Sequence, residues 1–210
     1  MTDPWPLHGL VLRTPRLELR PDDDDGLLEL AALADAGVHP DDEMPFLVPW
    51  TRFPNPGRSV LQYQWRCRAE LAPETWTVNF VVRAAGVVVG TQGLSARSFD
   101  VLREVETGSW LGQAHQGNGY GTEMRAAVLA FAFDHLGARA ARSAAFVDNA
   151  RSHGVSRRLG YRPDGTELRV REGACTIDVR LLLDPADLVR PDWKLQVEGL
   201  EPCLELLGAG

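Results

Sequence analysis

Residues 110–137 read WLGQAHQGNGYGTEMRAAVLAFAFDHLG, with glycines at positions 112, 117, 119 and 121 directly before an apolar segment. That segment is long enough for a helix of about 17 residues with one face packed on a core. Glycine permits positive φ and lets another group approach the main chain closely. Exposed amides and the dipole at a helix N-terminus favour a bound anion. The stretch therefore predicts either a plain turn that caps a helix or a loop that binds phosphate.

The two familiar nucleotide-binding glycine motifs do not fit this loop. Residues 116–121, QGNGYG, lack the Lys-Ser/Thr pair of a Walker loop, and their spacing is G-x-G-x-G rather than G-x-G-x-x-G. The β-rich runs TWTVNFVVR and GVVVGTQGLS precede the loop and are separated by a short turn, which is typical of an antiparallel hairpin. A Rossmann unit instead opens with a parallel βαβ crossover. The order of elements therefore disfavours a dinucleotide fold and leaves an anion site at a helix N-terminus.

Alternation and helical periodicity outline the rest of the chain as a mixed α/β domain. Residues 37–57 carry five prolines among aromatic side chains, and we expect an irregular segment that either lines a site or is pinned to the core. We expect strands and helices in the order β-α-α-β-β-β-α-β-α-β. The domain is predicted over residues 1–185, and residues 186–210 are predicted to be an arm that packs on the domain or on a partner.

Composition excludes several classes of protein. The net charge is −7 and the pI is about 5.2, so the chain lacks the basic excess of a general nucleic-acid or membrane binder. Its three cysteines are far apart and form no CxxC pair, which disfavours a disulfide framework and a metal site. The N-terminus shows no secretory signal, and the apolar runs are too short for a membrane span. We expect a cytoplasmic protein without a metal.

The loop and its flanks resemble a known family. Residues 116–121 match the Q/R-x-x-G-x-G/A loop of the GNAT family of N-acetyltransferases, which grips the pyrophosphate of acetyl-CoA. Four stretches are similar to the RimJ/RimL branch, which acetylates protein N-termini and diverse amines: TPRLELRP, VVVGTQGL, GSWLGQAHQGNGYGTEM and VDNARSHGVSRRLGYRPDG. Together they cover roughly residues 11–185. The stretches DDEMPFLVPWTR and TGSWLG are most similar to an actinobacterial subgroup associated with succinyl-CoA.

The resemblance implies a fold and a cofactor site. The fold is a mixed, mostly antiparallel sheet flanked by helices, with a V-shaped splay between two parallel strands that admits the pantetheine of an acyl-CoA. The splayed backbone is assigned to Trp110, Leu111 and Gly112, opposite residues 144–147. Asn149 is assigned to the pantetheine. The implied cofactor-binding residues of the loop are Gln116, Gly117, Asn118, Gly119, Tyr120, Gly121 and Thr122.

Two residues are candidates for acid and base. The resemblance puts Ser152 near the thioester sulfur, where its hydroxyl can protonate the departing thiolate. Strand parity places Glu106 on one face with Glu104 and Trp110, and a carboxylate there can take a proton from an amine directly or through water. Both have plain alternatives. Asn149 and Ser152 are ordinary helix-start residues, and Glu106 is equally a solvated carboxylate.

The predicted function is transfer of an acetyl or succinyl group from CoA to a primary amine. The acceptor is a protein N-terminus, a lysine or a small amine, and a homo-oligomer is left open. The alternatives are a non-catalytic acyl-CoA sensor and a nucleotide-binding domain whose sheet would be parallel from residue 16. A succinyl pocket needs a cation or several hydrogen-bond donors near the carboxylate, and Arg52 is the candidate cation that we take from the sequence.

Overall fold

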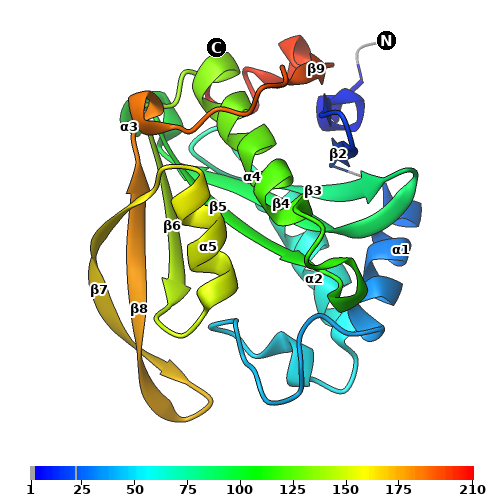
Figure 1. Ribbon diagram of the computed structural model, residues 1–210. Coiled ribbons are helices and arrows are strands. Elements are labelled where there is room, and N and C mark those ends of the chain that lie inside the picture. Colours follow the sequence, from blue (N-terminus) through cyan, green and yellow to red (C-terminus); the bar gives the residue numbers. More distant parts are fainter. Residues whose placement is uncertain (1–2, 22) are drawn as a thin grey trace.

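The computed structural model describes residues 3–21 and 23–210, and within them nine strands form one sheet (Figure 1). The strands are β1 Val11–Arg13, β2 Leu17–Arg20, β3 Thr75–Ala84, β4 Val87–Arg97, β5 Glu104–Leu111, β6 Ala140–Phe146, β7 Arg162–Arg171, β8 Ala174–Leu183 and β9 Gln196–Glu198. The helices are α1 Asp24–Asp35, α2 Pro56–Ala69, α3 Phe99–Leu102, α4 Tyr120–Ala130 and α5 Ala150–Arg158. The strand order across the sheet is β7-β8-β6-β5-β4-β3-β2-β1-β9.

The sheet is mostly antiparallel. Among the described strands, β5 and β6 form the parallel pair and the other neighbours run antiparallel. This confirms the predicted mixed α/β fold with a single parallel pair. Because β2 pairs antiparallel with both β1 and β3, the alternative of a nucleotide-binding domain with a parallel sheet from residue 16 is wrong.

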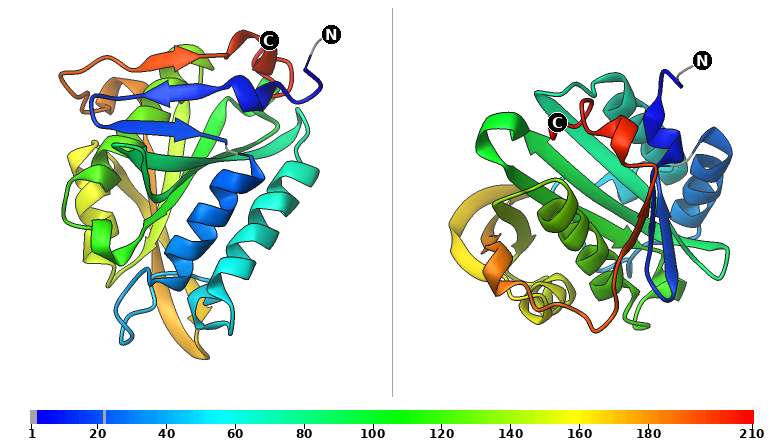
Figure 2. Two further views of the ribbon diagram at one scale, coloured as in Figure 1. Left: turned by 90° about the vertical axis from the view of Figure 1, so that its right-hand side faces the viewer. Right: turned by 90° about the horizontal axis from the view of Figure 1, so that it is seen from above.

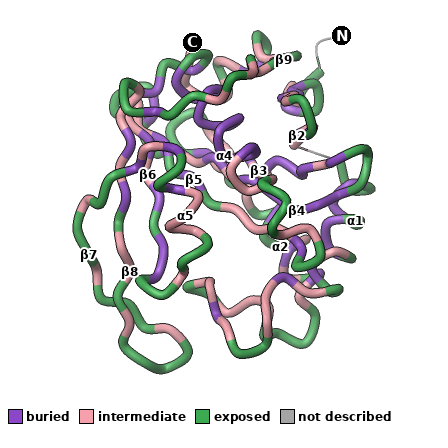
Figure 3. The backbone as a smooth tube through the Cα atoms, in the orientation of Figure 1, coloured by how far each residue is buried: buried purple, intermediate pink, exposed green. Residues whose placement is uncertain are grey.

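Helices cover both faces of the sheet. Figure 2 shows α1 and α2 side by side on one face, while α4 and α5 lie on the other. Alternation along β3 divides its side chains between two apolar clusters. Val81 packs with Leu30 of α1 and Val60 of α2. Phe80 points to the opposite face and meets Phe131, in the π-helical turn that continues α4, with ring centroids 6.3 Å apart. The sheet is therefore buried on both sides at its centre (Figure 3).

A fork opens between β5 and β6. The two strands pair only at their starts, from Glu104 opposite Ala140 to Glu106 opposite Arg142. Beyond that point β5 stays paired with β4 and β6 stays paired with β8, so their facing edges separate. At the start of the separation, Ser143 Oγ donates to Thr107 O at 3.3 Å. We use "fork" for the divergence of residues 107–111 from residues 143–146.

Some elements differ from the sequence prediction. The predicted order omits β1, α3, β7 and β9, and it starts α2 at Val60 rather than at Pro56. Strand β7 is an edge strand with mostly exposed residues, so it lacks the apolar alternation that identifies a half-buried strand. The last residues of the chain belong to the same unit, since β9 pairs with β1, Leu207 is buried, and Trp76 Nε1 donates to Leu207 O at 2.9 Å.

No helix among the residues that the structure describes combines the length and the apolar character that a membrane span requires.

Candidate functional site

A cleft of about 950 Å³ lies at the fork. This size lies within the range of about 300–1,000 Å³ that is typical of ligand pockets. Strands β5 and β6 supply Thr107, Gly108, Ser109, Trp110, Leu111, Ser143, Ala144 and Ala145. The glycine loop and α4 supply Gln116, Gly117, Gly119, Gly121, Thr122, Met124 and Arg125. Helix α5 and the Pro-rich segment supply Asn149, Ala150, Arg151, Ser152, Gly154, Val155, Arg158, Val38, His39, Pro45, Phe46 and Leu47.

The glycine loop leaves the N-terminus of α4 facing the cleft. Gly117 and Gly119 have φ values of 78° and 79°, a region that glycine reaches without steric cost. A Cβ added at Gly117 would meet nothing within 4 Å, so its conformation rather than packing requires glycine there. Gly119 is the N-cap residue, and no side chain caps the helix. The amides of this first turn are suited to an anion.

Side chains around the loop fix its shape. Gln116 Nε2 donates to Val38 O at 2.7 Å and to Leu111 O at 3.1 Å, which ties the loop to the Pro-rich segment and to β5. Asn118 Nδ2 donates to His115 O at 3.1 Å. The amides of Gln116 and Asn118 thus hold carbonyls of the loop and its neighbours. The expectation that the Gln116 side chain supports phosphates remains a prediction.

A buried carboxylate anchors the loop to the start of β2. Glu123 accepts hydrogen bonds from Thr14 Oγ1 at 2.6 Å, from Arg16 N at 3.2 Å and from Arg16 Nε at 2.6 Å. The Arg16 Nη1 group also donates to Asn118 O at 3.0 Å. The same guanidinium lies over the Tyr120 ring, 5.0 Å from its centroid. Residues far apart in the sequence therefore set the position of the glycine loop.

The predicted strand backbone lies along the cleft for part of its length. Trp110 and Leu111 line the cleft, whereas Gly112 does not. A Cβ at Gly112 would lie 2.5 Å from Leu33 Cδ1, so glycine there allows α1 to approach the strand. The Trp110 ring packs against Trp50, with centroids 5.5 Å apart. The Trp110 side chain thus packs on the α1 and α2 side, where Leu27 and Val60 belong to the same cluster.

Asn149 and Ser152 come together at the start of α5, and both line the cleft. Asn149 is the N-cap residue, and its Oδ1 accepts from Ser152 N at 3.0 Å. This is the ordinary capping arrangement. It fixes the Ser152 backbone at the cleft wall, and the contacts that the resemblance implies for the two residues remain predictions.

Glu106 lies outside the cleft. Its side chain is exposed, and it lies at the last position where β5 pairs with β6, opposite Arg142. Its neighbours Val105 and Thr107 are buried on the other face. Asn118, Tyr120 and Gly112 likewise do not line the cleft. Gly108 and Trp110, which share the strand face of Glu106, do line the cleft.

The Pro-rich segment contacts α5 through an ion pair and the β7–β8 hairpin through a hydrogen bond to Arg171. Arg151 Nη1 of α5 donates to Glu43 Oε2 at 2.7 Å. Arg171 donates to Asp148 at 2.9 and 2.7 Å and to Met44 O at 3.2 Å. This pairing lowers the pKa of the Asp148 carboxyl. Phe46 and Leu47 then line the cleft, which favours the view that this irregular segment lines a site.

Arg52 has a structural role in this segment. Arg52 Nη2 donates to Asp41 O at 2.6 Å, and its Nε donates to Glu172 Oε1 at 3.3 Å. It does not line the cleft. His39, for which the sequence suggests no partner, does line it, and its ring nitrogens lie 2.7 Å from Pro40 O and 2.7 Å from Thr51 Oγ1.

Arg125, which the sequence motifs do not single out, is a cleft residue on α4 that is only 5% exposed. Its Nη1 donates to Ser156 Oγ at 3.1 Å and its Nη2 to Ser109 Oγ at 3.2 Å. Burial lowers the pKa of this guanidinium, because the charged form loses hydration. The sequence nevertheless indicates that Arg125 is buried, because Arg125 shares a helix face with Val128 and Leu129, which are both buried.

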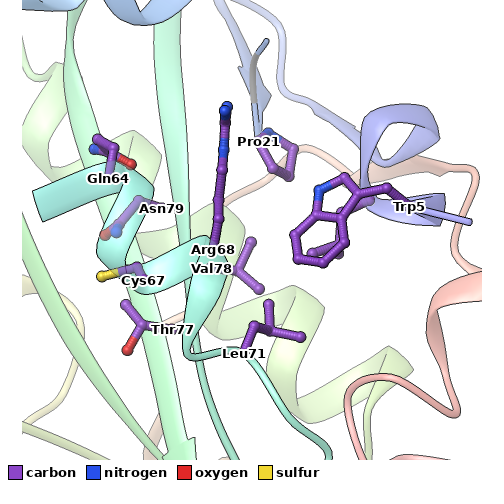
Figure 4. A pocket seen from close by; sticks show the side chains of 10 residues that line it. Trp5, Pro21, Gln64, Cys67, Arg68, Leu71, Thr77, Val78 and Asn79 are labelled. Atoms are coloured by element: carbon purple, nitrogen blue, oxygen red, sulfur yellow. The ribbon is translucent and has the colours of Figure 1, made fainter. Parts of the chain in front are cut away.

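A second cavity is far smaller than the cleft. It has a volume of about 20 Å³, lies under α2, and is lined by Trp5, Gln64, Cys67 and Asn79 among others (Figure 4). That volume suits about one water molecule. None of Cys67, Cys175 and Cys203 lines the cleft. Across residues 3–21 and 23–210, no cluster of His, Cys, Asp and Glu side chains is suited to a metal ion.

Comparison with known proteins agrees with this geometry. Residues 16–162 match the model of the acetyltransferase (GNAT) domain. The structure of Mycobacterium smegmatis RimJ in complex with CoA-disulfide is similar, with a TM-score of 0.70, 19% identity, and coverage of 88% of this chain and 91% of that chain. The structure of RimL, a ribosomal L7/L12 alpha-N-protein acetyltransferase in complex with coenzyme A, is similar with a TM-score of 0.65 and 16% identity, and the match covers 81% of this chain and 95% of that chain. The structure of the microcin C7 self-immunity acetyltransferase MccE in complex with acetyl-CoA and AMP is similar with a TM-score of 0.64 and 15% identity, and the match covers 81% of this chain and 93% of that chain.

Proposed function

The chain belongs to the GNAT acetyltransferase family, and from this premise we propose that it transfers an acyl group from an acyl-CoA to a primary amine. The cleft at the fork carries the proposal. It combines an uncapped helix N-terminus at the glycine loop with strand edges that diverge beyond Glu106 and Arg142. A long ligand with a phosphate-rich end and amide groups fits such a site. The first turn of α4 suits the pyrophosphate, and the separated edges of β5 and β6 suit the amides of pantetheine.

The proposed reaction is direct attack of the amine on the thioester. Backbone amides of β5 near Leu111 hold the developing oxyanion, which is the usual means of stabilising such a charge. Ser152 gives its hydroxyl proton to the departing thiolate. Glu106 takes the proton of the amine through water, since its carboxylate is exposed and does not line the cleft. No cysteine lines the cleft, which disfavours a route through a cysteine acyl-enzyme.

The proposed acceptor is the amine of a protein N-terminus, a lysine or a small amine. The similarity to RimJ and to RimL supports assignment to the RimJ/RimL branch, and RimL is itself an alpha-N-protein acetyltransferase. The net charge of −7 favours a cationic acceptor. Acetyl-CoA and succinyl-CoA are both proposed as donors.

The test is to incubate the purified protein with acetyl-CoA or succinyl-CoA and a panel of amines. The panel contains peptides with free N-termini, peptides with an internal lysine, and polyamines. We expect Kd values for the acyl-CoAs in the micromolar range, about −8 kcal/mol, together with release of free thiol and a matching mass increase of one amine class. Absence of acyl-CoA binding would overturn the proposal. Tight binding without thiol release across the panel would favour the alternative of an acyl-CoA sensor.

The Ser152→Ala variant tests the acid. The substitution keeps the backbone N–H that donates to Asn149 Oδ1, so the start of α5 should survive. We expect kcat to fall about 100-fold or more because the thiolate leaves without its proton donor, with little change in acyl-CoA affinity. Ser59→Ala on α2, where the Ser59 hydroxyl donates to Asn55 O at 3.3 Å, is the matched control. An unchanged kcat would limit Ser152 to helix capping.

A further inference from the structure

Arg125 carries a buried charge and lines the cleft between β5 and α5, a part that we call the floor of the cleft. Its side chain comes from the second turn of α4 and reaches Ser109 of β5 and Ser156 of α5, at 3.2 and 3.1 Å. Both partners are neutral hydroxyls. The Arg125 Nε group is buried and has no hydrogen-bond partner. A guanidinium has five N–H donors, and the two long bonds to hydroxyls do not satisfy them.

Within residues 3–21 and 23–210, no carboxylate forms an ion pair with Arg125. Other arginines of the domain behave differently. Arg171 pairs with Asp148, Arg151 with Glu43 and Arg142 with Glu104, although these pairs are more exposed. A buried charge without a counter-ion opposes folding. Arg125 is therefore placed to receive an anion that comes with a ligand.

The surroundings of Arg125 are rich in hydroxyls. Ser109 and Thr107 line the cleft from β5, and Ser143 lines it from β6. The Tyr161 hydroxyl lies 3.2 Å from Thr107 Oγ1, behind that wall. Hydroxyl groups can donate to a carboxylate without adding a competing negative charge. Glu106 lies outside the cleft, and none of the cleft-lining residues is an Asp or a Glu.

The position and charge of Arg125 disfavour three other parts of the substrates as its partner. Arg125 follows Tyr120 by five residues, which is about 7.5 Å along a helix, so it lies deeper than the pyrophosphate at the helix N-terminus. The acceptor is an amine, and its ammonium form would be repelled by the guanidinium. The pantetheine arm is neutral. The acyl group is the remaining part of the substrates that can bring a negative charge to the fork.

We propose that Arg125, with the hydroxyls of Ser109 and Ser156, binds a carboxylate at the free end of the acyl group. The donor class is then a dicarboxylic monoacyl-CoA, of which succinyl-CoA is the representative. This inference rests on the proposed function and specifies its donor. It replaces Arg52 as the cation of the acyl pocket, because Arg52 is held by Asp41 and Glu172 outside the cleft.

The test compares succinyl-CoA with butyryl-CoA, which has the same number of acyl carbons and a methyl group in place of the carboxylate. The measured quantity is the ratio of kcat/KM for the two donors with one amine acceptor. We expect the wild-type ratio to exceed 1. Arg125→Gln should lower the ratio about 10- to 100-fold, because a charge-assisted hydrogen bond contributes that much to discrimination. Arg157→Gln, at an exposed arginine of α5 that does not line the cleft, should leave the ratio unchanged.

Arg125→Met is a second test variant in case Arg125→Gln does not fold, since an apolar side chain of similar length often replaces a buried charge without loss of stability. It should lower the ratio as Arg125→Gln does. A wild-type ratio of 1 or less, or a ratio that both variants leave unchanged, would overturn the inference. Equal losses with both donors would assign Arg125 to the thiolate or to the fold. If the wild type turns over acetyl-CoA without preferring succinyl-CoA, the inference fails while the proposed function stands.

Discussion

Gly121→Val is expected to weaken acyl-CoA binding strongly while leaving the domain folded. Gly121 lines the cleft in the first turn of α4, and it is absent from the glycines that need positive φ. A Cβ there would meet Leu111 Cδ1 and Val155 Cγ2, both at 3.7 Å, which is ordinary contact. The protein therefore has room for the added Cβ. Valine also has a better helix propensity than glycine.

We expect the loss of CoA affinity to come from overlap between the valine side chain and the bound ligand. If a pyrophosphate lies against the amides of this turn, the valine methyl groups occupy its space. We expect Kd for CoA, measured by calorimetry, to rise by a factor of about 100 or more, equal to at least about 2.7 kcal/mol. The melting temperature should stay at or above that of the wild type. Gly9→Val is the control, because a Cβ at Gly9 meets nothing within 4 Å and Gly9 lies outside the cleft.

An unchanged Kd in Gly121→Val would contradict the assignment of the phosphate to this turn. A lower melting temperature accompanied by weaker binding would leave the two effects mixed. In that case Gly121→Ala is the decisive variant, since its single Cβ stays in ordinary contact with Leu111 and Val155. Weaker CoA binding by this smaller variant, at wild-type stability, would still locate the phosphate there.

Sequence patterns are sufficient to predict the elements whose structure depends on residues close together in the chain. Bare backbone before an apolar helix predicts the glycine loop, and Gly117 and Gly119 adopt the positive φ values that explain it. Two β-branched runs and a short turn predict the hairpin of β3 and β4, which the structure confirms. These features depend on neighbouring residues, which is why propensity and periodicity reveal them.

Features that depend on distant contacts are not predictable in this way. Strand β7 lies at the sheet edge and exposes most of its residues, so nothing in its pattern distinguishes it from a loop. Arg52 lies near aromatic residues in the sequence, which favours it as a pocket cation, but carbonyls of its own segment hold it. Arg125 escapes prediction because the sequence does not reveal whether a charged residue on an apolar helix face faces a cleft or has a partner carboxylate.

Glu123→Ala is expected to produce the second large effect, a loss of stability that also loosens the glycine loop. Glu123 is 8% exposed and accepts from Thr14 Oγ1, Arg16 N and Arg16 Nε. Removing its carboxylate leaves these donors without their partner. Because the Arg16 side chain is half exposed, the guanidinium can turn to water, and we expect a cost of about 2–4 kcal/mol. The melting temperature should fall by roughly 5–15 °C.

The matched control for Glu123→Ala is Glu167→Ala in β7, where Glu167 pairs with Arg169 at 2.7 Å and both side chains are more than 40% exposed. An exposed pair of this kind contributes about 0–1 kcal/mol. Equal destabilisation by the two variants would contradict the anchoring role of Glu123. The functional consequence follows from Arg16, which reaches from the start of β2 to Asn118 O in the loop. Without Glu123 this contact loses its support, so CoA affinity should fall together with stability, whereas Gly121→Val should separate the two.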